Sequence, residues 1–170
     1  MKKILLVVVI IIFITLLLPL AIVWLIGGSG EGQSPIESGT VSVYVSEEDC
    51  VKDMDINEYL KCVVAAEMPA DFEEEALKAQ AVAARTYLYS HIAEKDKGNI
   101  AESHNGAAIC TDSTHCQAYI SEDKRRESWG AGAEENWNKI STAVDETTGQ
   151  IMTYNDEIIS AVFHSTSSGI

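Results

Sequence analysis

The hydrophobic pattern divides the chain into an apolar N-terminal run and a mixed remainder. Ile4 to Ile26 carries no charge and follows Lys2 and Lys3. About 20 apolar residues span a bilayer as a helix. A cleaved signal peptide is the alternative, but its apolar part covers only about 7–15 residues and ends in small side chains. We therefore expect residues 1–27 to be a membrane anchor whose lysines keep the N-terminus in the cytoplasm.

The remainder predicts a flexible linker and one extracytoplasmic α+β domain. Residues 28–39 are mostly Gly, Ser and Glu, a linker composition, which leaves residues 40–170 for the domain. Val41 to Val45 alternates as a strand does. Further elements are expected as helices over 56–68, 71–94 and 134–147, a short strand over 117–120, and strands over 150–154 and 158–164 around an Asn155-Asp156 turn. The polar segment after the last strand suggests that the domain is truncated at its C-terminus.

The first two helices have recognisable boundaries. Asp55 can cap the first helix, and Pro69 ends it because the residue before a proline avoids the α conformation. Asp71 is expected to cap the second helix, with Glu74 completing a capping box. Small side chains fill positions 79–84 of that helix. Since they allow close approach of neighbours, the second helix is expected to be central.

Glu67 is the one carboxylate on the apolar stripe of the first helix. Burial disfavours a charged carboxylate, and so does the negative C-terminal end of a helix. A carboxylic acid kept protonated near neutral pH is what a glycosidase general acid requires. The alternative is a structural ion pair with Arg85, and a single glutamate does not decide between the two.

Two histidines and two cysteines fall within one short polar stretch. They are His104, Cys110, His115 and Cys116. Thiolate sulfur and neutral imidazole nitrogen are the preferred zinc ligands, and four of them form a closed tetrahedral site. Cys110 and Cys116 are also near enough in sequence to form a small disulfide loop. The residues alone leave zinc and disulfide equally open.

Charge and motif context exclude two other kinds of function. The formal net charge is −14, and the acidic residues all follow the apolar run, which disfavours nucleic acid binding. His164 and Ser165 are adjacent, so they rarely face each other, and no G-x-S-x-G turn surrounds them. Serine hydrolysis is therefore not expected.

Three segments of the domain resemble one known family, the stage II sporulation protein D family. The first comprises VVAAEMPA at 63–70 with EALKAQAVAARTY at 75–87; the others are TDSTHCQAY at 111–119 and FHSTSSG at 163–169. The resemblance implies a membrane-anchored lytic transglycosylase that cleaves peptidoglycan during engulfment in endospore formers. It implies that Glu67 is the acidic catalytic residue. It also implies a zinc site of the clostridial type at His104, Cys110, His115 and Cys116.

The resemblance further implies a substrate, partners and a location. The substrate is peptidoglycan glycan strands freed of stem peptides by a partner amidase. A complex with that amidase and a multi-span membrane protein is implied, between the mother-cell and forespore membranes. Candidate sugar-binding residues are Arg85, Gln117, Tyr119 and Ser165.

The implied reaction explains why one carboxylate can suffice. A lytic transglycosylase uses no water, because the 6-hydroxyl of N-acetylmuramic acid attacks C1 and forms a 1,6-anhydro ring. Glu67 would act first as acid and then as base. With four candidate ligands the zinc has no open position, so a structural role is expected. The main alternative is a glycan-binding protein that enhances an amidase; a zinc hydrolase and a non-catalytic structural protein are further alternatives.

Overall fold

The computed structural model describes residues 2–3, 13, 18 and 39–164. Within them, no helix has both the length and the apolar character needed to cross a membrane. The predicted anchor at 1–27 and linker at 28–39 lie almost wholly outside the described residues and stay predictions. The chain divides into the compact units Met1–Pro35 and Ile36–Ile170. All elements described below belong to the second unit, and Ser165 lies outside the described residues.

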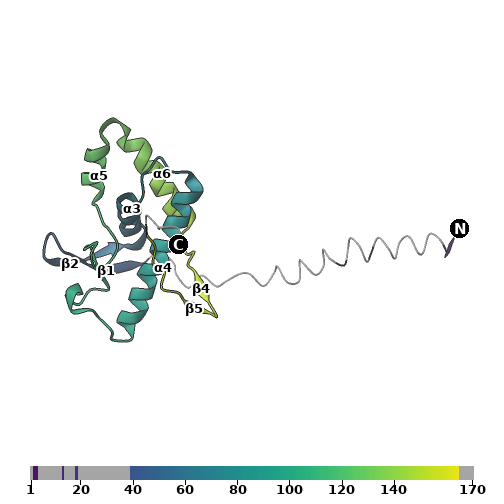
Figure 1. Cartoon of the computed structure of the whole chain (residues 1–170), viewed down its shortest axis with the longest axis horizontal. Helices are drawn as coiled ribbons and strands as arrows, with labels where there is room; N and C mark the ends of the chain where they lie inside the picture. The colour runs from purple at the N-terminus through teal and green to yellow at the C-terminus, as the bar shows by residue number, and fades with distance from the viewer. Residues whose placement is uncertain (1, 4–12, 14–17, 19–38, 165–170) are drawn as a thin grey trace, which may run out of the picture. The chain divides into compact units, whose positions relative to one another are not determined.

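The second unit has the predicted α+β architecture (Figure 1). A three-stranded sheet has the order β2-β1-β3, formed by β1 (Thr40–Val45), β2 (Cys50–Asp55) and β3 (Ile109–Cys110). β1 pairs antiparallel with β2 and parallel with β3. Val41, Val43 and Val45 alternate into the core, which confirms the strand predicted from their spacing.

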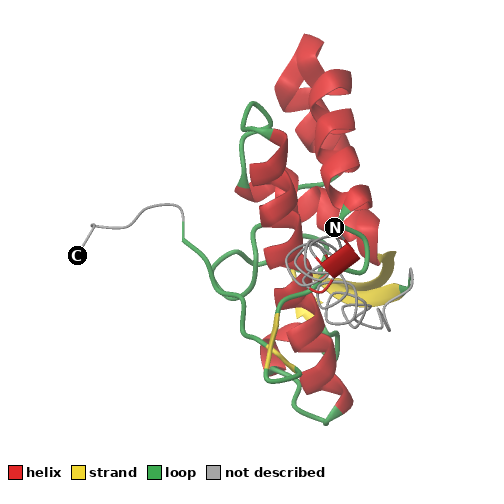
Figure 2. Cartoon of the chain, turned by 90° about the vertical axis from the view of Figure 1, so that its right-hand side faces the viewer, coloured by secondary structure: helices red, strands yellow, loops and turns green. Residues whose placement is uncertain are grey.

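Four helices make up most of the remaining fold (Figure 2). They are α3 (Ile56–Glu67), α4 (Glu74–Asp96), α5 (Glu122–Trp129) and α6 (Ala133–Glu146), with short 3₁₀ turns η2 (Glu102–His104) and η3 (Gly130–Gly132). α4 contacts α3, α6, β3 and β5, so the expectation of a central helix is confirmed. Its buried alanines, Ala81 and Ala84, have no exposed surface and permit that close packing.

The predicted boundaries of α3 are confirmed, whereas the predicted start of α4 is wrong. Asp55 Oδ1 accepts hydrogen bonds from the amides of Asn57 and Glu58, as a helix N-cap does. α4 begins at Glu74 with Glu73 at the cap position, and no side chain caps it. Asp71 instead lies in the turn closed by the Phe72 N–Pro69 O hydrogen bond, which delays the helix.

Other departures follow from weak patterns. β2 was not predicted because its side chains are mostly exposed and do not alternate. α5 was not predicted because it buries no residue and so has no apolar stripe. Residues 117–120 form no strand. The C-terminal hairpin is confirmed but short, with β4 (Thr153–Tyr154) and β5 (Glu157–Ile158) joined by Asn155 and Asp156, whose φ angles are 50° and 65°.

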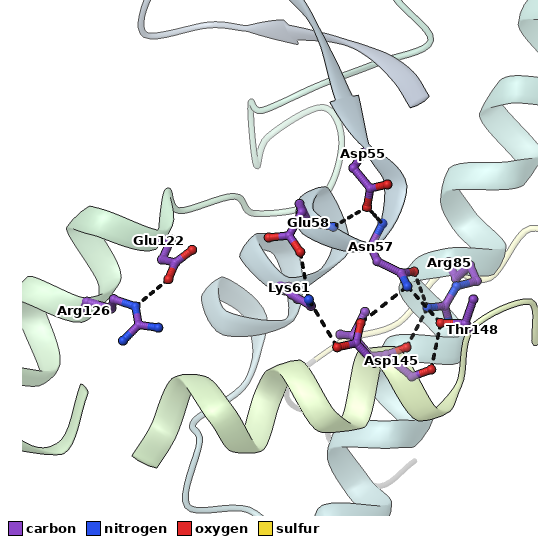
Figure 3. A network of polar contacts seen from close by, with 10 residues as sticks. Asp55, Asn57, Glu58, Lys61, Arg85, Glu122, Arg126, Asp145 and Thr148 are labelled. Atoms are coloured by element: carbon purple, nitrogen blue, oxygen red, sulfur yellow. Dashed lines mark hydrogen bonds and ion pairs between the residues drawn. The ribbon is translucent and has the colours of Figure 1, made fainter. Parts of the chain in front are cut away.

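The buried side chain of Arg85, on α4, links this helix to α3 and to the C-terminal end of α6. Arg85 is 1% exposed. Its guanidinium donates to Asn57 Oδ1 at 3.1 Å (Figure 3). It also donates to the carbonyls of Thr147 (2.6 Å) and Val144 (2.9 Å). These carbonyls lie at the end of α6, where no further turn of helix satisfies them. Arg85 thus gives each carbonyl a second donor, beside the Gln150 amide at Thr147 O (3.0 Å) and the Thr147 hydroxyl at Val144 O (3.1 Å).

Replacing Arg85 by Met should lower the free energy of unfolding by about 3 kcal/mol, because the buried hydrogen bonds of its guanidinium to Thr147, Val144 and Asn57 would be lost. The measurement is chemical denaturation monitored by circular dichroism. Arg126→Met is the matched control, since Arg126 pairs with the exposed carboxylates of Glu122 and Glu134. Its expected cost is about 1 kcal/mol or less. Equal costs for the two variants would disprove the capping role of Arg85.

Candidate active site and metal centre

Glu67 is the last residue of α3 and is partly buried. Its Oε1 accepts a hydrogen bond of 2.7 Å from the amide of Ala118. Among the described residues, Oε2 has no hydrogen-bond partner. The amide therefore fixes the orientation of the carboxyl group and leaves one oxygen available to a bound molecule.

Glu67 lines a groove of about 420 Å³. The other walls come from Tyr87 of α4, from Cys116 and Gln117 of the loop after β3, and from the segment 161–164 that follows β5. The groove thus joins a helix end, a polar loop and the chain after the hairpin. These are the three regions whose sequences resemble the sporulation family.

The side chain of Gln117 is unusual because it is buried and unpaired. It is 4% exposed, and neither its Oε1 nor its Nε2 has a hydrogen-bond partner among the described residues. An unsatisfied buried polar group costs about 1–3 kcal/mol. Its position at the groove favours pairing with a bound polar group or an ordered water.

The predicted metal ligands converge. The ligand atoms of His104, Cys110, His115 and Cys116 all lie within 4.8 Å of one another. His104 Nε2 is 3.2 Å from both His115 Nδ1 and Cys116 Sγ, and Cys110 Sγ is 3.5 Å from His115 Nδ1. Tetrahedral zinc with bonds of about 2.0–2.3 Å requires ligand separations of about 3.3–3.8 Å. The residues present therefore fit a four-coordinate metal ion, and all four cysteines are free thiols.

The surroundings act in opposite directions on the histidine and the cysteine ligand forms that a metal requires. Burial, reinforced by His115, lowers the pKa of His104 and keeps its imidazole neutral, while the backbone of Ala108 bonds to the same ring. Burial raises the pKa of Cys116 to about 12, so this thiol is protonated before a metal binds. Cys116 lines the groove together with Tyr87, so the cluster and the groove share a wall.

Other predicted site residues lie away from the groove. Arg85 uses its donors within the core. Tyr119 stacks on Tyr59 with ring centroids 5.8 Å apart and faces a different cavity, beside β2 and α5. Neither residue lines the groove of Glu67.

Sequence reasoning missed groove residues. Tyr87 was not among the candidate site residues, although it belongs to the first segment that resembles the family and lines the groove. His164 was considered only as a partner of Ser165, yet it lines the groove. Its place in the third similar segment was the signal available.

Fold and site together define an α+β protein with a carboxylate groove beside a Cys₂His₂ cluster that could hold a metal ion. The stage II sporulation protein family matches residues 44–154. Stage II sporulation protein D of Bacillus subtilis (strain 168) is 37% identical over 143 residues, which cover 83% of this chain. The chain belongs to the stage II sporulation protein D family, a family of sporulation proteins.

Two further relatives show how the similarity is distributed. Stage II sporulation protein D of Bacillus amyloliquefaciens is 37% identical over 137 residues, or 81% of this chain. The chain spans only 38% and 40% of the lengths of the two D proteins. The amidase enhancer of Bacillus subtilis is 36% identical over 110 residues, which are 65% of this chain and 12% of the enhancer.

The convergence of four ligands predicts one tightly bound metal ion per chain. Cys110→Ala should abolish stoichiometric binding and lower the unfolding free energy by about 3 kcal/mol when free metal exceeds the dissociation constant about 100-fold. Elemental analysis and thermal unfolding measure these effects. Cys50→Ala is the control, because Cys50 lies outside the cluster. Full metal content in the Cys110 variant would refute the assignment.

Metal affinity should fall on acidification by at least about tenfold per pH unit between pH 8 and 6. Throughout this range the Cys116 thiol, whose pKa in the metal-free site is about 12, must release its proton when the metal binds. Lower pH therefore opposes binding and removes the metal's contribution to stability. Competition with a chromophoric chelator measures the affinity; a constant affinity would contradict thiolate ligation.

Proposed function

We propose that this protein is a lytic transglycosylase that cleaves peptidoglycan glycan strands during engulfment in sporulation. The supporting observation is that Glu67 lines a groove together with the other two family-like segments. Membership in a sporulation family supplies the biological setting. The groove supplies a place for a sugar linkage beside a single carboxyl group.

Glu67 carries out both proton transfers in this proposal. Its protonated carboxyl gives a proton to the glycosidic oxygen that links N-acetylmuramic acid to the next sugar, and the C1–O bond breaks. The resulting carboxylate then takes the proton from the 6-hydroxyl of the same muramic acid. That oxygen bonds to C1 and closes the 1,6-anhydro ring, so no water is consumed. The nucleophile is part of the substrate, which lowers the entropic cost of the step.

The backbone amide of Ala118 orients this carboxyl group. With Oε1 held at 2.7 Å, Oε2 is the oxygen free to exchange protons with the substrate. The same amide stabilises the carboxylate that remains after the first proton transfer. Gln117, at the adjacent position, is proposed to bind the sugar.

Zinc is the metal proposed for the Cys₂His₂ cluster, and it supplies a structural cross-link when bound. His104, Cys110, His115 and Cys116 would hold it and occupy four positions. Cys116 also lines the groove, so the cross-link fixes one groove wall. The role resembles that of other structural metal sites, in which binding contributes to folding.

Location and partners complete the proposal. The apolar residues 4–26 anchor the chain in a membrane, with the domain outside the cytoplasm between mother cell and forespore. An amidase that removes stem peptides supplies denuded glycan, and a multi-span membrane protein completes the complex. The similarity to an amidase enhancer supports the link to an amidase.

That similarity also favours a second candidate function. In it, the domain binds glycan strands and enhances an amidase without cleaving any bond. The groove and the metal cluster would serve binding, and Glu67 would act only as a hydrogen-bond acceptor.

Replacing Glu67 by Gln tests the leading proposal. The variant should lose at least about 100-fold of its activity, because an amide cannot provide the general acid and base. The measurement is mass spectrometry of 1,6-anhydro products formed from denuded glycan strands by the purified protein.

Glu127→Gln is the matched control, since Glu127 is exposed on α5 and lies outside the groove. It should retain wild-type product formation. If the wild-type protein forms no anhydro product yet still binds glycan and stimulates an amidase, the second candidate replaces the first.

A further inference from the structure

A second cavity, larger than the groove of Glu67, lies on the other side of the metal cluster. Its volume is about 790 Å³, against about 420 Å³ for the groove. Pockets of about 300–1,000 Å³ accommodate ligands larger than a single small group. The proposed proton transfers involve only the groove, so this cavity has no role in them.

The cavity continues the groove along three elements. On α4 the groove is lined by Tyr87, and the cavity by His91 and Glu94 one and two turns further on. At the metal cluster Cys116 faces the groove, whereas His104 and His115 face the cavity.

The third shared element is the chain after the hairpin. Segment 161–164 lines the groove, and Glu157, Ile158 and Ser160 line the cavity. The two hollows are therefore neighbours along the same three elements.

The lining suits a sugar. Imidazole rings at His91 and His115 offer flat surfaces, and Ile158 adds an apolar contact. Ser160 and Asn99 are exposed and offer neutral hydrogen-bonding groups. Apart from a few alanines and Ile158, the side chains that line the cavity are polar, which suits a ligand rich in hydroxyl and amide groups.

Charge in the cavity favours an uncharged sugar. Lys97 is paired with Glu94 at 2.7 Å, and Glu157 lines the same cavity, so carboxylates exceed ammonium groups. An anionic group on the ligand would be repelled by this excess negative charge. N-acetylglucosamine carries no charge, whereas denuded N-acetylmuramic acid carries a free carboxylate.

We propose that this cavity is a distal glycan subsite that binds an N-acetylglucosamine residue of the strand whose linkage lies at Glu67. The inference rests on the proposed function, because it takes the same strand as ligand. It makes affinity depend on chain length: a strand long enough to cross both hollows binds more tightly than a short one.

Blocking the cavity with an indole ring tests the subsite. Calorimetry measures the binding of two denuded glycan strands, a disaccharide and an octasaccharide. The protein is the full chain carrying Glu67→Gln, so that the strands are not cleaved during the measurement. Without further change, the octasaccharide should bind at least about tenfold more tightly, a difference of about 1.4 kcal/mol. Adding Ser160→Trp should reduce the ratio of the octasaccharide affinity to the disaccharide affinity to near one.

Two further variants guard against indirect effects. Asn99→Trp fills the cavity from its loop wall and should have the same effect as Ser160→Trp. Ser128→Trp, on the exposed face of α5 outside both hollows, should leave the ratio unchanged. Metal content and thermal unfolding of each variant show that the fold is intact.

The outcomes separate this inference from the proposed function. The distal subsite is overturned if the octasaccharide and the disaccharide bind equally tightly to the Glu67→Gln protein. It is also overturned if the octasaccharide keeps its higher affinity in both folded tryptophan variants. Absence of anhydro products from the unmutated protein overturns the transglycosylase activity but leaves the binding result valid. Loss of the ratio only in Ser160→Trp and Asn99→Trp supports the subsite.

Discussion

The site depends on one hydrogen bond between segments far apart in sequence. The amide of Ala118 donates to Glu67 Oε1 at 2.7 Å and thereby fastens the loop after β3 to the end of α3. Ala118 follows Cys116 and Gln117, so the same bond sets the positions of a metal ligand and a groove residue. The positions of the carboxyl group, the metal cluster and the groove wall are consequently coupled through this hydrogen bond.

That arrangement stands on a rigid helical core. Glu67 is the last residue of α3 and lines the groove. Val63 and Val64, one turn earlier on the same helix, are fully buried. α4 packs between its neighbours through small side chains, and Arg85 ties it to the end of α6 (Figure 3). Helices positioned by such packing hold a side chain more accurately than loops do. The carboxyl group is thus placed by the core, and the loops provide the remaining walls.

The sequence predicted the features that arise from strong local patterns. The alternation of β1, the cap at Asp55, the interruption at Pro69 and the Asn155-Asp156 turn all follow from short-range physics, and the structure has them. The four candidate metal ligands could be named from the sequence because few residue types bind zinc, and the structure brings them together.

Features that depend on tertiary contacts were not predictable. β2 and α5 have no apolar periodicity, so only their packing reveals them. Arg85 was expected to contact the substrate, but both terminal nitrogens of its guanidinium donate to groups inside the core that are distant in sequence. The unpaired side-chain amide of Gln117 and the cavity beside His91 result from contacts between segments distant in sequence, so the sequence alone does not reveal them.

The hairpin has a consequence for how a polymer reaches the site. Its strands have two residues each, and the Met152 amide is held by Thr86 Oγ1 at 2.9 Å. Because few hydrogen bonds hold so small an element, we expect it to open without disturbing the helices behind it. Under the proposed function, such opening would let a denuded glycan strand enter the groove sideways along its length, with no chain end to thread.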